Sequence, residues 1–310
     1  FSPKTGLIDP FGGQRDLKNG VLRAVGQPEK RFDEDALRIL RGLRFAARLA
    51  FSIEEETAQA MFAQKHLLTA LAAERVQAEL LPLLCAPGAV TVLRQFREIF
   101  AVILPEIIPM FDFDQQNKHH LYDVWEHTLH TLEHIEPRPH LRLVMLLHDC
   151  GKPARFTIDF RGDGHFYGHA YESARRAEEA LTRLRCDKET VARVTRLIAF
   201  HDHDILNSEK SLLRWLRKIG EVDLRDLLAI ETEASDAYQM LMQRNGAGSE
   251  NLDWMDLPEQ SEEEIEKILT ADEMKAFHIT VAFFRLQLFP DLAHAMKEEL
   301  ASSMYREVNR

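Results

Sequence analysis

A histidine and an aspartate stand side by side at positions 148 and 149, directly after an apolar run. The run 141–147 predicts a buried helix, and Gly151 and Pro153 follow as a helix cap and a helix stop. A single histidine usually has a structural role in a protein. Neutral imidazole next to carboxylate, however, is a ligand set for a hydrolytic divalent metal ion. The doublet therefore indicates a metal site at the end of a buried helix.

Four arginines, Arg38, Arg41, Arg44 and Arg48, recur every three or four positions and would line one side of a helix. We expect Asp33 to cap this helix, Glu34 and Asp35 to lie in its first turn, and Leu37, Leu40 and Ala47 to face a core. Stacked guanidinium groups repel one another unless acids or phosphates neutralise them, and a guanidinium pairs with a phosphate or the edge of a base. A nucleotide or RNA contact and a solvated helix face both stay open on these residues alone.

Helices must position both groups of residues, and the sequence is mainly helical in pattern. Residues 5–26 are short apolar runs broken by Asp-Pro, Gly-Gly and Asn-Gly, which predicts strands and tight turns. From Asp33 onward the apolar period changes to that of helices. Residues 156–167 are the exception, because two alternating runs flank a Gly-containing turn and predict a hairpin. The expected helices are 33–50, 54–63, 74–85, 88–99, 121–135, 139–149, 170–185, 188–201, 209–219, 222–242, 261–269, 272–289 and 291–308.

Bulk composition narrows the class of protein. A length of 310 residues predicts two or three packed units, and no apolar run approaches the roughly 20 residues that span a bilayer. The three cysteines Cys85, Cys150 and Cys186 are odd in number and far apart, which favours a reducing cytoplasm over a disulfide framework.

The net charge of −11 argues against a nucleic-acid partner, yet residues 1–50 hold ten basic and only six acidic side chains. A polyanion-facing N-terminal part on an acidic body would produce this asymmetry.

Three segments follow one another in a specific order and spacing: Gly6-Leu-Ile-Asp-Pro-Phe-Gly-Gly-Gln-Arg-Asp-Leu17, Arg23-Ala-Val-Gly26 and Arg31-Phe-Asp-Glu-Asp-Ala-Leu-Arg-Ile-Leu-Arg41. Together they resemble the late motifs of bacterial tRNA nucleotidyltransferases (CCA-adding enzymes) and related poly(A) polymerases. In that family the Glu-Asp-x-x-Arg stretch opens a helical neck and reads the Watson–Crick edges of CTP and ATP. The resemblance assigns this role to Asp35 and Arg38, with Arg41 and Arg44 as further nucleotide-binding residues. The segment 74–80 resembles the motif that ends the neck.

The chain departs from this family in one respect. Nucleotidyl transfer requires paired aspartates on a β-sheet head, which follow a Gly-rich turn and hold two Mg²⁺ ions. No Gly-Gly pair leads into an Asp-x-Asp strand here, and the sequence starts at Phe1 rather than Met. We therefore expect the catalytic head and its Mg²⁺ site to lie outside this chain, upstream of a cropped start. By itself the chain is not expected to add nucleotides.

A second resemblance concerns His127, the doublet His148-Asp149 and the segment 227–236, which ends in Asp236. The series of one His, a His-Asp pair and a late Asp is similar to that of the HD phosphohydrolase superfamily. It implies that His127, His148, Asp149 and Asp236 bind a divalent metal ion such as Mg²⁺, Mn²⁺ or Ni²⁺, and Asp236 is preferred to Asp202 as the last ligand.

The same resemblance extends to the groups around this metal. His148 and Asp149 would be catalytic, and Lys152 would steady the phosphate. His169 and His201 are candidate ligands of a second metal ion, as in binuclear HD enzymes. The alternative is a helix-cap role for His169 and an exposed helix end for His201.

The predicted fold is mainly α: terminal strands of a nucleotidyltransferase head (1–26), a helical neck that binds nucleotide and RNA (27–110), an HD-type helical domain (111–242) and a C-terminal helical body (243–310). The predicted function is addition of CCA to tRNA 3′ ends, with ATP, CTP and tRNA as partners and phosphoester hydrolysis, for example of a 2′,3′-cyclic end, in the HD domain. A stand-alone HD phosphohydrolase and a non-catalytic RNA-binding module are the alternatives. We expect a cytoplasmic protein without a membrane partner.

Overall fold

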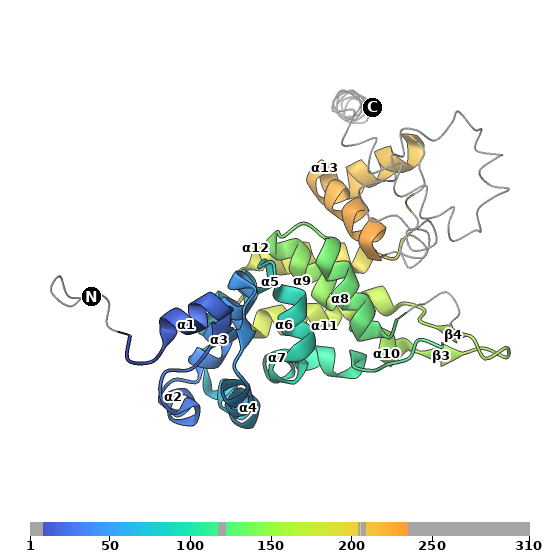
Figure 1. Ribbon diagram of the computed structural model, residues 1–310. Helices are drawn as coiled ribbons and strands as arrows, with labels where there is room; N and C mark the ends of the chain where they lie inside the picture. Colours follow the sequence, from blue (N-terminus) through green and yellow to red (C-terminus); the bar gives the residue numbers. More distant parts are fainter. Residues whose placement is uncertain (1–8, 117–121, 204, 206–208, 235–310) are drawn as a thin grey trace, which may run out of the picture.

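The computed structural model describes residues 9–116, 122–203, 205 and 209–234, and it is mainly helical (Figure 1). The described part contains two small sheets of two strands each. The expected helices from residue 261 onward, like the predicted C-terminal body at 243–310, lie outside the described residues. This architecture confirms the predicted mainly α fold class.

The N-terminal half is a series of short helices joined by tight connections. Its elements are α1 (Gly13–Asn19), β1 (Val21–Leu22), α2 (Pro28–Glu34), α3 (Leu37–Leu49), β2 (Ser52–Ile53), α4 (Glu55–Gln64), the 3₁₀ helix η1 (Lys65–Ala70), α5 (Ala73–Leu84), α6 (Ala89–Gln95), α7 (Arg97–Ile103) and η2 (Pro105–Met110). Strand β1 pairs in parallel with β2, so that α3 is bracketed by the two strands.

The C-terminal half holds the longer helices and a hairpin. Its elements are α8 (Val124–His134), α9 (Pro139–Leu147), α10 (Lys152–Arg155), β3 (Thr157–Ile158), β4 (Gly164–His165), α11 (His169–Arg183), α12 (Lys188–Phe200) and α13 (Glu209–Ala234). Helix α12 packs against α9, α11 and α13, and α8 packs against α9. Helices α8, α11, α12 and α13 therefore all pack against α9.

Helix α3 shows why the N-terminal half holds together. Leu37, Leu40 and Ala47 face the core as predicted, and Ile39, Leu43 and Ala46 join them on the buried side. This face packs against α5 and α6. Burial of each leucine or isoleucine stabilises the fold by about 1.5–3 kcal/mol, so the apolar stripe fixes which side of α3 carries the arginines.

The strands expected across residues 5–26 are wrong for most of the described part, because residues 13–19 form helix α1. The glycines taken as turn signals are helix ends: Gly12 and Gly20 adopt left-handed φ values of 72° and 65° at the two caps. Asp9 accepts hydrogen bonds of 2.8 Å from the backbone N–H groups of Gly13 and Gln14. Only Val21–Leu22 is a strand here.

The helix expected over 33–50 is two helices, and Asp33 is not its N-cap. Asp33 lies within α2, which ends at Glu34, and α3 starts at Leu37. Asp35 between them has extended backbone, and its carboxylate accepts a hydrogen bond of 3.1 Å from Leu37 N–H. The Asp-rich stretch therefore forms a joint between two helices rather than the first turn of one.

The helix expected over 88–99 is also divided. Helix α6 ends at Gln95 and α7 begins at Arg97, because Phe96 leaves the helical conformation and its buried ring stacks on Phe62 at a centroid distance of 5.3 Å.

The hairpin predicted at 156–167 is confirmed, since β3 and β4 are antiparallel and Gly162 in their turn has a φ of 88°. The break expected between 219 and 222 is confirmed at Gly220, which is non-helical inside α13. Across the described residues no single helix has the length and hydropathy to cross a bilayer, although α5 and α6, bent by 119°, meet that test as a pair on length and composition.

Candidate metal centre and nucleotide-contact residues

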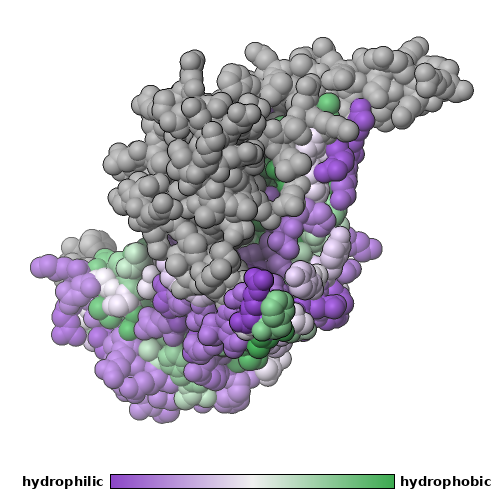
Figure 2. Space-filling model, turned by 90° about the vertical axis from the view of Figure 1, so that its right-hand side faces the viewer, coloured by the Kyte–Doolittle hydropathy of each residue, from purple (hydrophilic) through white to green (hydrophobic). Residues whose placement is uncertain are grey.

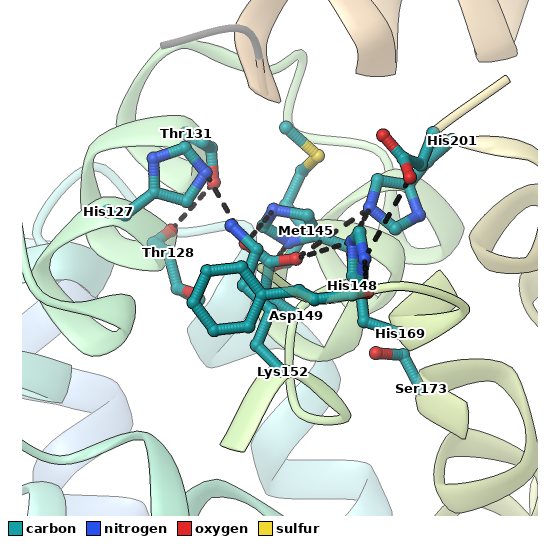
Figure 3. A network of polar contacts seen from close by, with 12 residues as sticks. His127, Thr128, Thr131, Met145, His148, Asp149, Lys152, His169, Ser173 and His201 are labelled. Carbon is teal, nitrogen blue, oxygen red and sulfur yellow. Dashed lines mark hydrogen bonds and ion pairs between the residues drawn. The ribbon is translucent and has the colours of Figure 1, made fainter. Parts of the chain in front are cut away.

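Five buried side chains from four helices gather at the carboxyl end of α9 (Figure 3). His127 comes from the first half of α8, and His148 and Asp149 directly follow α9. His169 is the first residue of α11, and His201 directly follows α12. The structure thus brings the predicted doublet together with His127 and with both candidate residues for a second metal.

Asp149 lies between two pairs of imidazole rings. Its Oδ2 atom is 3.5 Å from His127 Nε2 and 3.2 Å from His148 Nε2. Its Oδ1 atom is 3.3 Å from His169 Nε2 and 3.7 Å from His201 Nε2. Each carboxylate oxygen therefore faces its own pair of histidines.

Backbone carbonyls orient three of these rings in the same way. The Nδ1 atoms of His148, His169 and His201 lie 2.8, 3.0 and 2.7 Å from the carbonyl oxygens of the residues three positions earlier. Because a carbonyl oxygen only accepts, Nδ1 carries the proton in each neutral ring and Nε2 presents a lone pair. All three Nε2 atoms face Asp149. Such carbonyl-held imidazoles are typical of metal-ligating histidines.

Two observations test whether these residues fit a divalent cation. His169 Nε2 and His201 Nε2 lie 3.2 Å apart, so two lone pairs of neutral rings face each other. His148 Nε2 is buried without a hydrogen-bond partner among the described residues. The possible ligand atoms form two groups, His127 with His148 and Asp149, and Asp149 with His169 and His201, each within 4.8 Å. A cation would satisfy this concentration of acceptors, so the residues fit.

Lys152 supplies a positive charge inside the cluster. Its Nζ atom is 2.8 Å from Asp149 Oδ2 and donates a hydrogen bond of 2.9 Å to Gln115 Oε1. Burial would raise the pKa of Asp149, but the neighbouring His148 ring and the charge of Lys152 outweigh this effect and hold the pKa well below its usual range. Asp149 is therefore ionised, which a metal ligand requires.

Gln115 is a site residue that no motif or spacing in the sequence predicted. The Gln115 side chain is buried, and its Nε2 donates to the carbonyl oxygen of Tyr122 at 2.9 Å while its Oε1 accepts from Lys152. It fixes where the ammonium group of Lys152 lies.

The remaining predicted ligands differ in position. Asp236 lies outside the described residues. Asp202, the rejected alternative, is 54% exposed and its Oδ2 is 3.8 Å from His169 Nδ1, on the side of that ring away from Asp149.

The predicted nucleotide-contact residues lie at the joint between α2 and α3 and along α3. Asp35 is held by Arg75 of α5, whose Nη2 is 3.1 Å from Asp35 Oδ2. Arg38 donates to the Arg31 carbonyl oxygen at 2.8 Å and to Glu34 at 2.5 Å. These side chains are partly exposed, so solvent and ligands reach them.

Arg41 and Arg44 share one carboxylate, that of Glu79 on α5. Arg44 Nε lies 2.5 Å from Glu79 Oε2, with side chains 17% and 13% exposed, whereas Arg41 Nε is 3.8 Å from Oε1 and half exposed. Arg44 therefore ties α3 to α5, and Arg41 is the more accessible of the two. Arg75 and Glu79 both fall in the segment 74–80 that the sequence singled out as a motif.

Comparison with known proteins decides the family. A CC-adding tRNA nucleotidyltransferase of Thermus thermophilus is 35% identical over 239 residues, which are 72% of this chain and 54% of the relative. The A-adding tRNA nucleotidyltransferase of Deinococcus radiodurans is 33% identical over 263 residues, 77% of this chain and 60% of the relative. The chain belongs to the family of CCA-adding tRNA nucleotidyltransferases.

Other members of this family match in the same region. The multifunctional CCA protein of Neisseria gonorrhoeae is 37% identical over 226 residues, 68% of this chain and 53% of the relative. Residues 50–111 match the family described as a probable RNA- and SrmB-binding site of polymerase A. The chain spans a little over half the length of these curated relatives. A solved CCA-adding enzyme of Bacillus stearothermophilus in complex with CTP aligns with 77% of this chain and 53% of its own, with 21% identity and a TM-score of 0.47.

Proposed function

We propose that this chain is the nucleotide-selecting and tRNA-binding part of an enzyme that adds CCA, from CTP and ATP, to tRNA 3′ ends. The observation that carries the proposal is the identity of 33–37% to tRNA nucleotidyltransferases across 68–77% of the chain. The partly exposed carboxylate and arginines at the α2–α3 joint support it, because they offer one acceptor and several donors to the edge of a base.

The ion pairs at this joint are suited to exchange with a nucleotide. Asp35 is 30% exposed and Arg38 34% exposed. Ion pairs of this exposure are worth about 0–1 kcal/mol each, so a base edge that replaces them meets little resistance. A carboxylate accepts from the exocyclic amino group that C and A share, whereas U and G present a carbonyl oxygen at that position. Asp35 would therefore favour CTP and ATP, with Arg38 and Arg41 donating to the neighbouring acceptors.

The test measures which nucleotides are selected by the protein in the form that its natural source produces. We expect Asp35→Ala to lower the preference for CTP and ATP over UTP and GTP by roughly 10- to 100-fold, because a good base contact is worth about 1–3 kcal/mol. Asp33→Ala is the matched control, since Asp33 accepts a hydrogen bond from Gln64 of α4 instead. Equal selectivity in the two variants would refute the role of Asp35.

We propose a second function, metal-dependent hydrolysis of phosphoesters, for the cluster around Asp149. The observation that favours it is the buried carboxylate between four histidines, three of them held by carbonyl oxygens. His127, His148, Asp149, His169 and His201 would hold the metal, and the sequence adds Asp236. A divalent cation there supplies a Lewis acid that polarises a phosphoryl oxygen and activates water. Lys152, fixed by Gln115, places a positive charge beside Asp149 where it can steady a phosphate.

Hydrolysis of a nucleoside 2′,3′-cyclic phosphate in the presence of Mg²⁺, Mn²⁺ or Ni²⁺ tests this function. The double variant His148→Ala, Asp149→Ala should lose the activity. His134→Ala should keep it, because His134 is an exposed histidine at the far end of α8. Turnover that survives in the double variant, or that needs no metal, would contradict the assignment.

A further inference from the structure

An exposed tyrosine stands two residues before His169 of the proposed metal centre. Tyr167 follows β4 and its side chain is 77% exposed. One face of its ring stacks on His165, with centroids 5.3 Å apart and planes at 11°. A large aromatic side chain that is exposed yet fixed in orientation offers its outer face to a ligand.

The hairpin turn holds the supporting histidine in place. His165 Nε2 lies 3.2 Å from Asp159 Oδ2 across the hairpin. The other oxygen of Asp159 accepts hydrogen bonds of 2.8 and 3.0 Å from the backbone N–H groups of Arg161 and Asp163. The chain from turn to carboxylate to imidazole to phenol is therefore continuous, and the Tyr167 ring is preorganised.

Tyr167 is also close to the cluster along the chain. It stands two residues before His169, so their Cα atoms are at most about 7 Å apart. Phe166 lies between β4 and Tyr167. Its carbonyl oxygen orients the His169 ring, and its own ring lies 5.4 Å below the ammonium group of Lys152. The stacked pair of Tyr167 and His165, called the platform below, is thus tied through Phe166 to two residues of the proposed hydrolytic site.

We propose that Tyr167, supported by His165, stacks against the unpaired base of a single-stranded RNA end whose phosphoester enters the metal centre. This inference rests on the proposed hydrolytic function for the purpose of the platform, but not for its binding of a base. Aromatic rings bind unpaired bases through their π faces, without a requirement for a particular base.

The surroundings favour RNA over an apolar protein segment. The hairpin also carries the charged residues Asp159, Arg161 and Asp163, and Arg155, which precedes the hairpin, has a half-exposed side chain. Among the described residues, which are drawn in colour in Figure 2, the face that carries the hairpin is largely hydrophilic, with separate hydrophobic patches. A protein partner would require a larger continuous apolar surface. The exposed side chains of Arg155 and Arg161 supply positive charge for the phosphates of an RNA end.

The experiment measures binding of a short fluorescent oligoadenylate to the full chain. Tyr167→Ala and Tyr167→Leu should weaken binding roughly 5- to 100-fold, the range for loss of one base–aromatic stack, and Tyr167→Phe should bind as the unsubstituted chain does. His165→Ala should give a smaller loss. Phe160→Ala is the matched control at the hairpin tip, where Phe160 is 91% exposed. Equal losses in Phe160→Ala and Tyr167→Ala, or tight binding by Tyr167→Leu, would overturn the proposal.

A kinetic arm separates this inference from the proposed hydrolysis. With adenosine 2′,3′-cyclic phosphate as substrate, Tyr167→Ala should raise KM. The loss of efficiency should lie in KM rather than in kcat. One result is that the unsubstituted chain shows no hydrolysis and its binding of oligoadenylate still depends on Tyr167. In that case the hydrolytic function fails and the base-stacking role of Tyr167 stands. If hydrolysis occurs and KM and oligoadenylate binding are the same in Tyr167→Ala, the platform fails and the hydrolytic function stands.

Discussion

Asp226 of α13 should be the residue whose charge contributes most to docking α13 on the cluster-bearing helices. Its side chain is 2% exposed, and it meets Arg138 at 2.7 Å, His140 of α9 at 2.8 Å and Arg193 of α12 at 2.7 Å. Asp226→Asn keeps the shape and removes the charge that these three groups surround.

The expected loss of folding free energy follows from how exposed Asp226 and its partners are. Removal of one partner from a fully buried ion pair costs about 3–5 kcal/mol. The side chains of the three partners are 18–38% exposed, so solvent compensates part of the loss. We expect about 2–3 kcal/mol, which lowers Tm by roughly 4–12 °C in a unit of 150–250 residues.

The pH dependence of this loss of stability is a second test of the role of Asp226. Burial raises the pKa of Asp226, but the hydrogen bond with His140 and the charges of the arginines outweigh it, so this pKa is lowered. The folded-state pKa is below the unfolded value of about 3.9, so the charge stabilises the fold above that pH and stops doing so as pH falls through the folded-state pKa. The difference in stability between the two proteins should therefore be constant near neutrality and narrow below about pH 4.

Denaturant unfolding followed by circular dichroism at several pH values measures both effects. Glu179→Gln is the matched control, because Glu179 pairs with Arg175 at 2.5 Å in the open, with both side chains more than half exposed. It should change the free energy of unfolding by less than about 0.5 kcal/mol. If Asp226→Asn is no more destabilising than this control at pH 7, the docking role of Asp226 is refuted.

Three further predictions concern packing and chemistry near the two sites. Gly164→Ala would place a methyl group against the Gln115 carbonyl oxygen and 2.7 Å from the Phe156 ring, so thermal unfolding should show a loss of about 1–3 kcal/mol. Burial raises the pKa of Cys150 to about 12, so iodoacetamide at pH 8 should leave Cys150 unlabelled in the folded protein and label it after unfolding, as peptide mass spectrometry can check. Glu79→Gln should cost about 1–2 kcal/mol in denaturant unfolding, between the limits for surface and buried pairs, because Arg44 loses its carboxylate; a change below 0.3 kcal/mol would contradict that estimate.

The sequence indicated the residues that gather around Asp149 because their signals are local. The doublet at positions 148 and 149 ends an apolar helix, and each carbonyl-held histidine takes its acceptor from three residues earlier. What the sequence could not supply is the convergence of α8, α9, α11 and α12, which depends on packing between distant segments. Gln115 had no pattern at all, since its role exists only once Lys152 is placed beside it.

Two predictions for the N-terminal end were wrong, the strands over 5–26 and the single helix over 33–50. Both errors have the same physical cause. Glycine and aspartate signal both turns and helix ends, because both uses need a left-handed residue or a side chain that accepts from the backbone. At Gly12, Gly20 and Asp9 the helix-end use applies, and at Asp35 the carboxylate serves a joint between two helices. The apolar face of α3 was predictable because Leu37, Leu40 and Ala47 repeat at the helical period.

Metal content is the most direct measure of whether Asp149 and the surrounding histidines form a divalent metal centre. The chain should be purified without chelator, equilibrated with Mn²⁺ or Ni²⁺, and analysed by elemental mass spectrometry together with thermal unfolding. At a free metal concentration of 100 times Kd, binding stabilises the folded state by about 2.7 kcal/mol. We predict one or two ions per chain and this stabilisation in the unsubstituted protein and in His134→Ala, with both absent in the double variant His148→Ala, Asp149→Ala. The same metal content in the double variant and the unsubstituted chain, or no bound metal in either, would contradict the account.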